Sequence, residues 1–409
     1  MRQVLRQSQH RASPPPSRAA STVRAVRVLV APDKFAGTLT AVDAAQAIVD
    51  GWRRTAPHDE LVAVPLADGG PGFVDVLHAT LGGDLVHLDV TGPLGAPVRA
   101  AYLRVGATAY VECAQACGMH LVPQPRDPRT TTTYGVGELV LDAVRRGSAR
   151  IVVGLGGSGT NDAGAGLLAA LGATAVDDGG TDVSGLMRGG GAALGGVVAV
   201  DLAPARAAVA GVEVVVASDV DNPLLGQRGA TNGFARQKGA DDDAVMVLEG
   251  ALERFAVACG RRPDGKDPAV ALGAGAAGGL GYALLQLGAA RVPGIATVLD
   301  VVDLAGRLGG CDLVVTGEGA FDWQSLRGKV VSGVAAAALE QGRPCLVLAG
   351  RVDVGRREYG ASGVSGALAV VDDLRDRGLA PDDALARALA DPAVCLADLA
   401  ARAARTWSR

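Results

Sequence analysis

A glycine-rich loop between two apolar segments constrains the possible folds of this chain more than any other feature. Ile151–Val153 has the composition of a buried strand, and Gly154-Leu-Gly-Gly-Ser-Gly-Thr-Asn-Asp162 follows it directly. The next segment, Ala163–Leu171, is rich in small residues and ends at Gly172, as a closely packed helix would. A strand that passes through a tight loop into a helix is the unit that builds parallel sheets, so the loop predicts an α/β protein.

The same alternation of apolar strands and helices recurs near both ends of the chain. Further strands are expected at Val26–Ala31, Leu61–Pro65, Asp312–Thr316, Cys345–Ala349 and Gly366–Val371. Thr40 and Asp43 have the spacing of a capping box, which predicts that a helix begins at Ala41. Residues 85–112 instead alternate in polarity around a turn at Thr91–Gly95, a pattern typical of paired strands.

We therefore expect a parallel-sheet, Rossmann-like α/β domain built from both chain ends, with a second α/β domain inserted. The expected limits are residues 26–85 plus 270–375 for the discontinuous domain, 86–269 for the inserted domain and 376–409 for a C-terminal helical extension. Residues 1–25 carry five arginines, three consecutive prolines and no acidic residue. This segment is interpreted as a disordered tail rather than a transit peptide, because it lacks an amphipathic period.

Composition excludes several classes of function. A net charge of −4 and an aromatic content of 3% argue against a nucleic-acid binder, which needs a basic face and stacking surfaces. No apolar run approaches the ~18 residues that span a membrane. The six cysteines are scattered and lack the spacing of a metal site, which favours a reducing cytoplasm. We expect a cytoplasmic protein that acts on a small molecule, and the oligomeric state stays open.

The loop itself supports two kinds of nucleotide site. Gly154–Gly159 matches the dinucleotide fingerprint G-x-G-x-x-G, and Asp177 and Asp178 follow about 20 residues later, which favours a nicotinamide-linked oxidoreductase. However, Asn161 and Asp162 lie where the pyrophosphate would meet the helix. A carboxylate there repels a bare phosphate but suits a Mg²⁺ ion between the two, so a Mg-nucleotide is favoured. A purely structural tight turn remains the third interpretation.

Acidic residues follow several of the expected strands. Asp68 comes after the strand at Leu61–Pro65, Asp219 and Asp221 follow Val212–Ala217, and Glu318 and Asp322 follow Asp312–Thr316. Each could simply cap a helix, but ligands of open parallel sheets bind at the carboxyl ends of strands. Two lysines in similar loops, Lys238 and Lys329, offer the positive charge that phosphoryl transfer requires.

These motifs, taken together and in order, resemble the type I glycerate kinases over most of the chain, from about Val26 to Val371. The resemblance rests on the segments Ala31–Leu39, Pro65–Gly70, Val90–Gly95, Arg129–Gly135, Gly156–Asp162, Asp219–Leu224, Gln237–Gly239, Gly273–Gly279, Thr316–Gly319, Gln324–Leu326 and Gly328–Lys329. It implies phosphotransfer from ATP to glycerate, with phosphoglycerate as the product, and a two-domain architecture.

Roles follow for individual residues under this resemblance. Predicted nucleotide-binding residues are Gly156, Gly157, Ser158, Gly159, Thr160, Asn161, Gly275 and Gly278. Predicted binders of the hydroxy acid are Lys34, Asp68, Thr131, Thr132 and Thr133. Mg²⁺ is assigned to Asp162, Asp219 and Asp221, catalysis to Asp219, Lys238 and Asp322, and the general base is either Asp219 or Asp322.

The chain departs from the family pattern in several loops, including Phe234–Ala240, and three of the departures remove a charged group. The family usually has lysine where Ala36 stands, an acid where Pro71 stands and arginine where Ala320 stands. These changes leave open which hydroxy acid is the substrate, and whether its 2- or 3-hydroxyl accepts the phosphoryl group. They also keep a diverged, non-catalytic relative that binds a hydroxy acid or nucleotide as an alternative, beside the oxidoreductase.

Overall fold

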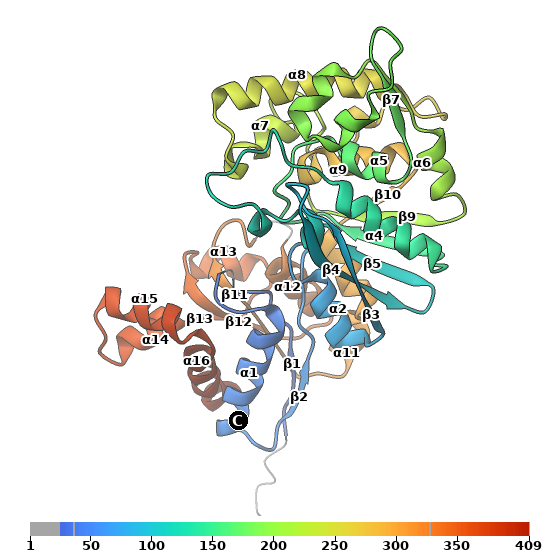
Figure 1. The fold of residues 1–409 in the computed structure, drawn as a ribbon. Coiled ribbons are helices and arrows are strands. Elements are labelled where there is room, and N and C mark those ends of the chain that lie inside the picture. Colours follow the sequence, from blue (N-terminus) through green and yellow to red (C-terminus); the bar gives the residue numbers. More distant parts are fainter. Residues whose placement is uncertain (1–24, 36, 327–328, 409) are drawn as a thin grey trace, which may run out of the picture.

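The computed structural model describes residues 25–35, 37–326 and 329–408, and two sheets organise these residues (Figure 1). The first sheet has the strand order β13-β12-β11-β1-β2, and all its strands run parallel. Its strands are β1 (Arg27–Val30), β2 (Glu60–Ala63), β11 (Leu313–Phe321), β12 (Cys345–Val352) and β13 (Gly366–Ala369). The prediction of a parallel α/β fold drawn from both chain ends is confirmed, since β1 pairs with both β2 and β11.

The second sheet has the order β10-β9-β6-β5-β4-β3. It contains β3 (Asp84–Thr91), β4 (Pro97–Val105), β5 (Thr108–Glu112), β6 (Arg150–Gly154), β9 (Glu213–Ala217) and β10 (Ala290–Val292). Strands β3, β4 and β5 pair antiparallel, as the alternating pattern of residues 85–112 predicted, whereas β5, β6, β9 and β10 run parallel. A short antiparallel pair, β7 (Thr174–Val176) and β8 (Ala199–Asp201), lies apart from both sheets.

Strand β10 belongs to the second sheet although it lies beyond residue 270, where the chain was expected to return to the first domain. Ala290–Val292 pairs with β9, so the chain returns to the first sheet only after residue 292. A three-residue strand is too short to show the alternation of apolar and polar residues from which a strand is predicted. The domain limits themselves remain a prediction, and most of the tail expected at residues 1–25 lies outside the described residues.

Helices cover both sheets. Around the first sheet lie α1 (Ala41–Thr55), α11 (Leu304–Gly309), α12 (Val330–Glu340) and α13 (Arg356–Ala361), whereas α2 (Phe73–Leu81) and α10 (Gly294–Val301) also contact strands of the second sheet. The second sheet is accompanied by α3 (Ala114–Cys117), α4 (Tyr134–Arg145), α5 (Ala165–Ala170), α6 (Ala203–Ala208), α7 (Ala230–Phe234), α8 (Asp242–Cys259) and α9 (Ala276–Gln286). Thr40 is the N-cap of α1, and its Oγ accepts the N–H of Asp43, as expected. No described helix is long and apolar enough to cross a membrane.

Three C-terminal helices complete the lower part of the molecule in Figure 1: α14 (Val370–Asp376), α15 (Pro381–Ala390) and α16 (Pro392–Trp407). Helix α16 lies along α1, and Leu396 and Leu399 share an apolar core with Ile48 and Trp52. The two backbones come so close that a Cβ on Gly51 would lie 1.9 Å from the carbonyl oxygen of Ala397. Glycine at this position therefore fixes the C-terminal helices against α1.

Replacing Gly51 by alanine should destabilise the protein by roughly 1–3 kcal/mol, because α16 must move to admit the methyl group. Gly250→Ala on α8 is the matched control, since a Cβ there meets nothing within 4 Å. Removal of a helical glycine at that site should add up to about 1 kcal/mol of stability. Chemical denaturation measures both changes, and equal stabilities for the two variants would contradict the close α1–α16 contact.

Candidate functional site

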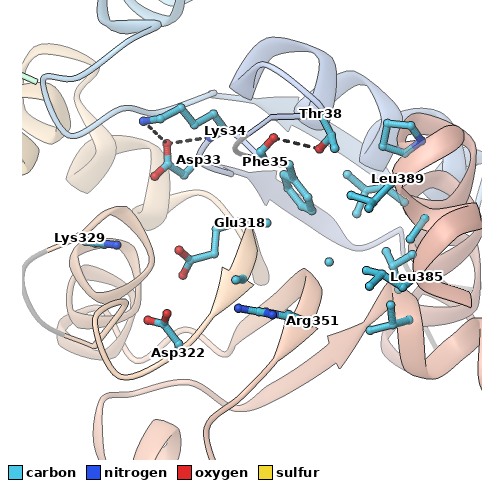
Figure 2. Close-up of a pocket in the computed structure, with 18 of the residues that line it drawn as sticks. Asp33, Lys34, Phe35, Thr38, Glu318, Asp322, Lys329, Arg351, Leu385 and Leu389 are labelled. Atoms are coloured by element: carbon cyan, nitrogen blue, oxygen red, sulfur yellow. Dashed lines mark hydrogen bonds and ion pairs between the residues drawn. The ribbon is translucent and has the colours of Figure 1, made fainter. Parts of the chain in front are cut away.

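A cleft of about 510 Å³ lies at the carboxyl edge of the first sheet (Figure 2). Its walls come from the loop after β1, the loop after β2, the ends of β11 and β12, the segment before α12, and the C-terminal helices. The lining residues are Asp33, Lys34, Phe35, Thr38, Asp68, Glu318, Gly319, Ala320, Asp322, Lys329, Gly350, Arg351, Val370, Val371, Leu385, Ala388, Leu389, Pro392 and Leu396. Charged side chains thus meet where ligands of parallel sheets bind.

One end of the cleft is organised around Lys34. Its Nζ lies 3.7 Å from Oδ1 of Asp33 and 3.8 Å from Oδ1 of Asp68, and its backbone N–H donates to Asp33 at 2.7 Å. Burial acts to lower the pKa of Lys34, but the two carboxylates outweigh it and raise that pKa. Burial also raises the pKa of Asp33 to about 6. Lys34 therefore stays protonated at neutral pH, and it lies beside Asp33, whose pKa is about 6.

Glu318 is the buried carboxylate of the cleft. Only 8% of the residue is exposed, and within residues 25–35, 37–326 and 329–408 its Oε1 has no hydrogen-bond partner. Burial raises its pKa to about 7. Figure 2 shows its carboxylate pointing into the cleft between Lys329 and Asp322. A buried acceptor without a donor is costly, so this oxygen is suited to a ligand that brings a cation or a proton donor.

Two of the predicted catalytic or metal-binding acids lie near the cleft but are already engaged. Asp322 lines it, and its Oδ1 accepts the N–H groups of Gln324 at 2.7 Å and Ser325 at 3.2 Å. Burial would raise its pKa, but these N–H groups and Lys329 lower it. Asp219 accepts the N–H groups of Gly294 at 3.0 Å and Ile295 at 3.2 Å, which begin α10.

The surroundings of Asp219 place it next to the loop of Asp68. A Cβ on Gly294 would lie 2.4 Å from the carbonyl oxygen of Asp68 and 3.1 Å from Oδ2 of Asp219. Partial burial, together with the charge of Asp68, raises the pKa of Asp219. Asp221 points elsewhere, since it forms an ion pair with Arg291 at 2.6 Å. The structure thus brings Lys34, Asp68 and Asp219 together, and it leaves Asp221 out.

The glycine-rich loop contacts protein along its length. The N–H of Gly156 donates to Gly69 at 3.1 Å, and a Cβ on Gly156 would lie 2.2 Å from Cα of Gly70. Gly157 has a φ of +72°, and its Cβ would meet the ring of Pro71 at 2.5 Å. The glycines therefore allow the loops after β2 and β6 to touch backbone to backbone, a role that the fingerprint spacing alone could not distinguish from phosphate binding.

Asp162 is fully buried and accepts hydrogen bonds from four directions. Its Oδ2 accepts from the N–H and Oγ of Thr133 at 2.8 and 2.9 Å and from the N–H of Gly166 at 3.3 Å. Its Oδ1 accepts the N–H of Gly164 at 3.1 Å. The carboxylate therefore joins the start of α5 to the segment before α4. Asp162 has no exposed surface and does not line the cleft, and its assignment to Mg²⁺ stays a prediction.

The remaining predicted residues line the interior around this loop. Lys238 is buried, and its Nζ donates to Oγ of Ser158 at 3.0 Å and to the carbonyl of Thr160 at 2.7 Å. Burial lowers the pKa of Lys238 to about 8. Buried groups with similar structural contacts are Gly159, Asn161, Thr131, Thr132, Gly275 and Gly278. These residues pack around the loop and do not line the cleft.

Three residues that line the cleft, Asp33, Glu318 and Arg351, had no role predicted from the sequence. Asp33 lies within a motif that the sequence singled out, but nothing there indicated that it would be buried beside Lys34. Glu318 belonged to an acidic loop and received no role. Arg351 carried no signal, because its place in the cleft depends on its cross-strand pairing with Ala320. Among the described residues, no group of three or more His, Cys, Asp or Glu side chains is arranged to hold a metal ion.

The fold and the cleft define an α/β enzyme with a charged small-molecule site at the carboxyl ends of parallel strands. The chain belongs to the glycerate kinase family, since the model of that family matches residues 28–408. It is 41% identical to the glycerate kinase of Bacillus subtilis, over 80% of this chain and 85% of that protein.

Two further relatives support the assignment. The glycerate 2-kinase of Escherichia coli K12 is 38% identical over 91% of this chain and 98% of that protein. A crystal structure of the Salmonella typhimurium LT2 protein assigned as glycerate kinase 2 superposes with a TM-score of 0.76 at 35% identity. That alignment covers 94% of this chain and 98% of the other.

Asp162→Asn should lower the free energy of unfolding by about 2 kcal/mol or more, because an amide group would face N–H donors that now have an acceptor. Asp300→Asn, at an exposed position of α10, should change it by less than about 0.5 kcal/mol. Chemical denaturation distinguishes the two variants. An Asp162→Asn protein of unchanged stability but without activity would contradict the structural role and restore the predicted metal site.

Proposed function

We propose that this protein is a cytoplasmic glycerate kinase that transfers the γ-phosphoryl group of Mg²⁺-bound ATP to a hydroxyl of glycerate in the cleft. The observation that carries the proposal is the meeting of Lys34, Lys329 and Arg351 with four carboxylates in one cavity of a glycerate kinase family member. Phosphoryl transfer depends on positioning and on positive charge around the moving group. The six free, buried cysteines fit a reducing compartment.

The hydroxy acid is assigned to the end around Lys34. This ammonium is held as a cation by Asp33 and Asp68, and it can pair with the carboxylate of glycerate. Asp68 is only partly buried, and its carboxylate can accept a hydrogen bond from a hydroxyl of the substrate. We do not assign substrate binding to Thr131, Thr132 and Thr133, because they are buried beside the second sheet.

Asp33 is the base that we propose in place of Asp219 and Asp322. Its carboxyl group lies beside Lys34 and has a pKa of about 6, so at neutral pH it is ionised and still basic enough to accept a proton. Asp322 has a lowered pKa and is therefore the weaker base, and Asp219 does not line the cleft and holds the two N–H groups that begin α10.

The phosphate groups are assigned to Lys329 and Arg351. Arg351 lies opposite Ala320 on the neighbouring strand, so it brings a cation to the place where the family's usual arginine is absent. Glu318 fits a Mg²⁺ ion, since its buried Oε1 lacks a partner among the described residues and Mg²⁺ binds one or two carboxylates together with phosphate oxygens. When bound there, Mg²⁺ would neutralise charge on the phosphates. Ala36, a further departure from the family, lies outside the described residues.

The oxidoreductase alternative receives no support from the glycine-rich loop. A pyrophosphate would need the N–H groups and the space that Gly69, Gly70 and Pro71 already occupy. The kinase is tested by coupled ADP release with both glycerate enantiomers and a panel of small hydroxy acids. Glycerate-dependent ADP release is expected, and a product analysis assigns the 2- or 3-hydroxyl. A folded protein that turns over none of these acids would overturn the proposal in favour of a non-catalytic relative.

Asp33→Asn should lower kcat by about 10² to 10⁴-fold, the usual range for loss of a general base. Asp50→Asn, at an exposed position of α1, is the control and should keep wild-type turnover. Steady-state assays with saturating glycerate and ATP measure both. If Asp33→Asn retained wild-type kcat, the base would have to be sought elsewhere.

The pH dependence of kcat/KM should fall on the acid side as the pH drops through about 7, and more steeply below about 6. Glu318 and Asp33 both act in their ionised forms, and each loses its charge below its own raised pKa. A profile from about pH 5 to about pH 9 tests this. Wild-type activity that stays constant well below pH 6 would exclude both carboxylates from these roles.

A further inference from the structure

The end of the cleft opposite Lys34 is apolar and has no part in the roles assigned so far. Phe35, Val370, Leu385, Leu389 and Leu396 line it. Figure 2 shows Leu385 and Leu389 projecting from the C-terminal helices, while the labelled carboxylates and Lys329 lie toward the other side. Arg351 lies between the two ends. The cavity is therefore amphipathic along its length.

The exposure of these leucines is unusual for their size. Leu385 is 49% and Leu389 58% exposed, although α15 and α16 bury other apolar residues against α1 and the first sheet. An apolar cluster that stays open inside a cavity, next to charged groups, is typical of a binding site. Since the apolar and the charged surfaces belong to one cavity, a single ligand with an apolar part and an anionic part fits it better than a separate protein partner.

Glycerate cannot be that ligand by itself. Each of its three carbons carries oxygen, so it has no apolar surface to bury against leucine and phenylalanine. A cleft of about 510 Å³ also lies within the range that holds drug-sized ligands, far larger than a three-carbon acid. The phosphoryl donor does have both parts: a flat, largely apolar purine base and a polyphosphate that suits Lys329 and Arg351.

We propose that Phe35, Leu385 and Leu389 form the site for the purine base of the phosphoryl donor, so that the C-terminal helices supply one wall of the nucleotide site. The polyphosphate then runs past Arg351 toward Lys329 and Lys34, where the hydroxy acid binds. This assignment rests on the proposed kinase function, and it places the donor at the carboxyl edge of the first sheet rather than at the glycine-rich loop.

The test compares two probes that differ only in the nucleoside: ADP and inorganic triphosphate, each with Mg²⁺. Leu389→Asp and, as a second variant, Leu385→Asp place a carboxylate where the base would lie. The dissociation constant of ADP should rise by about tenfold or more, which corresponds to about 1.4 kcal/mol. Competition by inorganic triphosphate should change much less, because it never touches that wall. KM for glycerate should stay close to wild type.

Leu339→Asp is the matched control, because Leu339 is 61% exposed on α12 and does not line the cleft. It should leave both probes and turnover unchanged. Leu389→Asp and Leu385→Asp could each leave the affinity for ADP unchanged in an enzyme that still phosphorylates glycerate. That result would overturn the proposed purine site but not the kinase function. An equal loss for ADP and inorganic triphosphate would also overturn the purine site, since the effect would then lie at the phosphates. A wild-type protein that binds no ADP and releases none with glycerate would overturn the kinase function as well.

Discussion

The backbone contact between the loops after β2 and β6 is the constraint on which the rest of the structure depends. A Cβ on Gly156 would lie 2.2 Å from Cα of Gly70, so glycine at this position lets the two loops meet backbone to backbone. This contact joins the edges of the two sheets and places the loop of Asp68 beside Asp219 and the start of α10. Asp68, placed by this contact, lies 3.8 Å from Nζ of Lys34 at the charged end of the cleft.

The polar residues of the chain fall into two sets with different physical tasks. Asp162, Lys238 and Thr133 are buried, and their hydrogen bonds hold the glycine-rich loop against its neighbours. Asp33 and Glu318 are almost as buried, but they face a cavity, and burial raises their pKa values toward neutrality. Groups of the first set are satisfied within the protein, whereas in the second set Asp33 pairs with Lys34 and Oε1 of Glu318 has no partner among the described residues. This difference, rather than residue type, is what separates scaffold from proposed site.

Much of the fold could be predicted from the sequence, because strand composition and the N-cap at Thr40 are local signals. Part of the site could be too: Lys34, Asp68 and Asp322 meet in the cleft. The role of Gly156 could not, because its spacing is the same whether it faces a phosphate or Gly70, and the decision lies with a loop distant in sequence. Arg351 reaches the cleft through the register between β11 and β12. Leu385 and Leu389 reach it because the C-terminal helices pack against α1. Neither arrangement can be recognised from the local sequence.

The pairing of β1 between β2 and β11 has a consequence for biosynthesis. Val28 pairs with Leu61 and with Leu313, so one edge of β1 stays without its partner while the intervening chain is made. At ordinary translation rates that interval is roughly 12 to 50 seconds for the ~250 residues between β2 and β11. During this time a buried apolar strand offers an open edge to any neighbouring nascent chain. Folding on the ribosome must therefore keep this edge of β1 from pairing with another chain until β11 emerges.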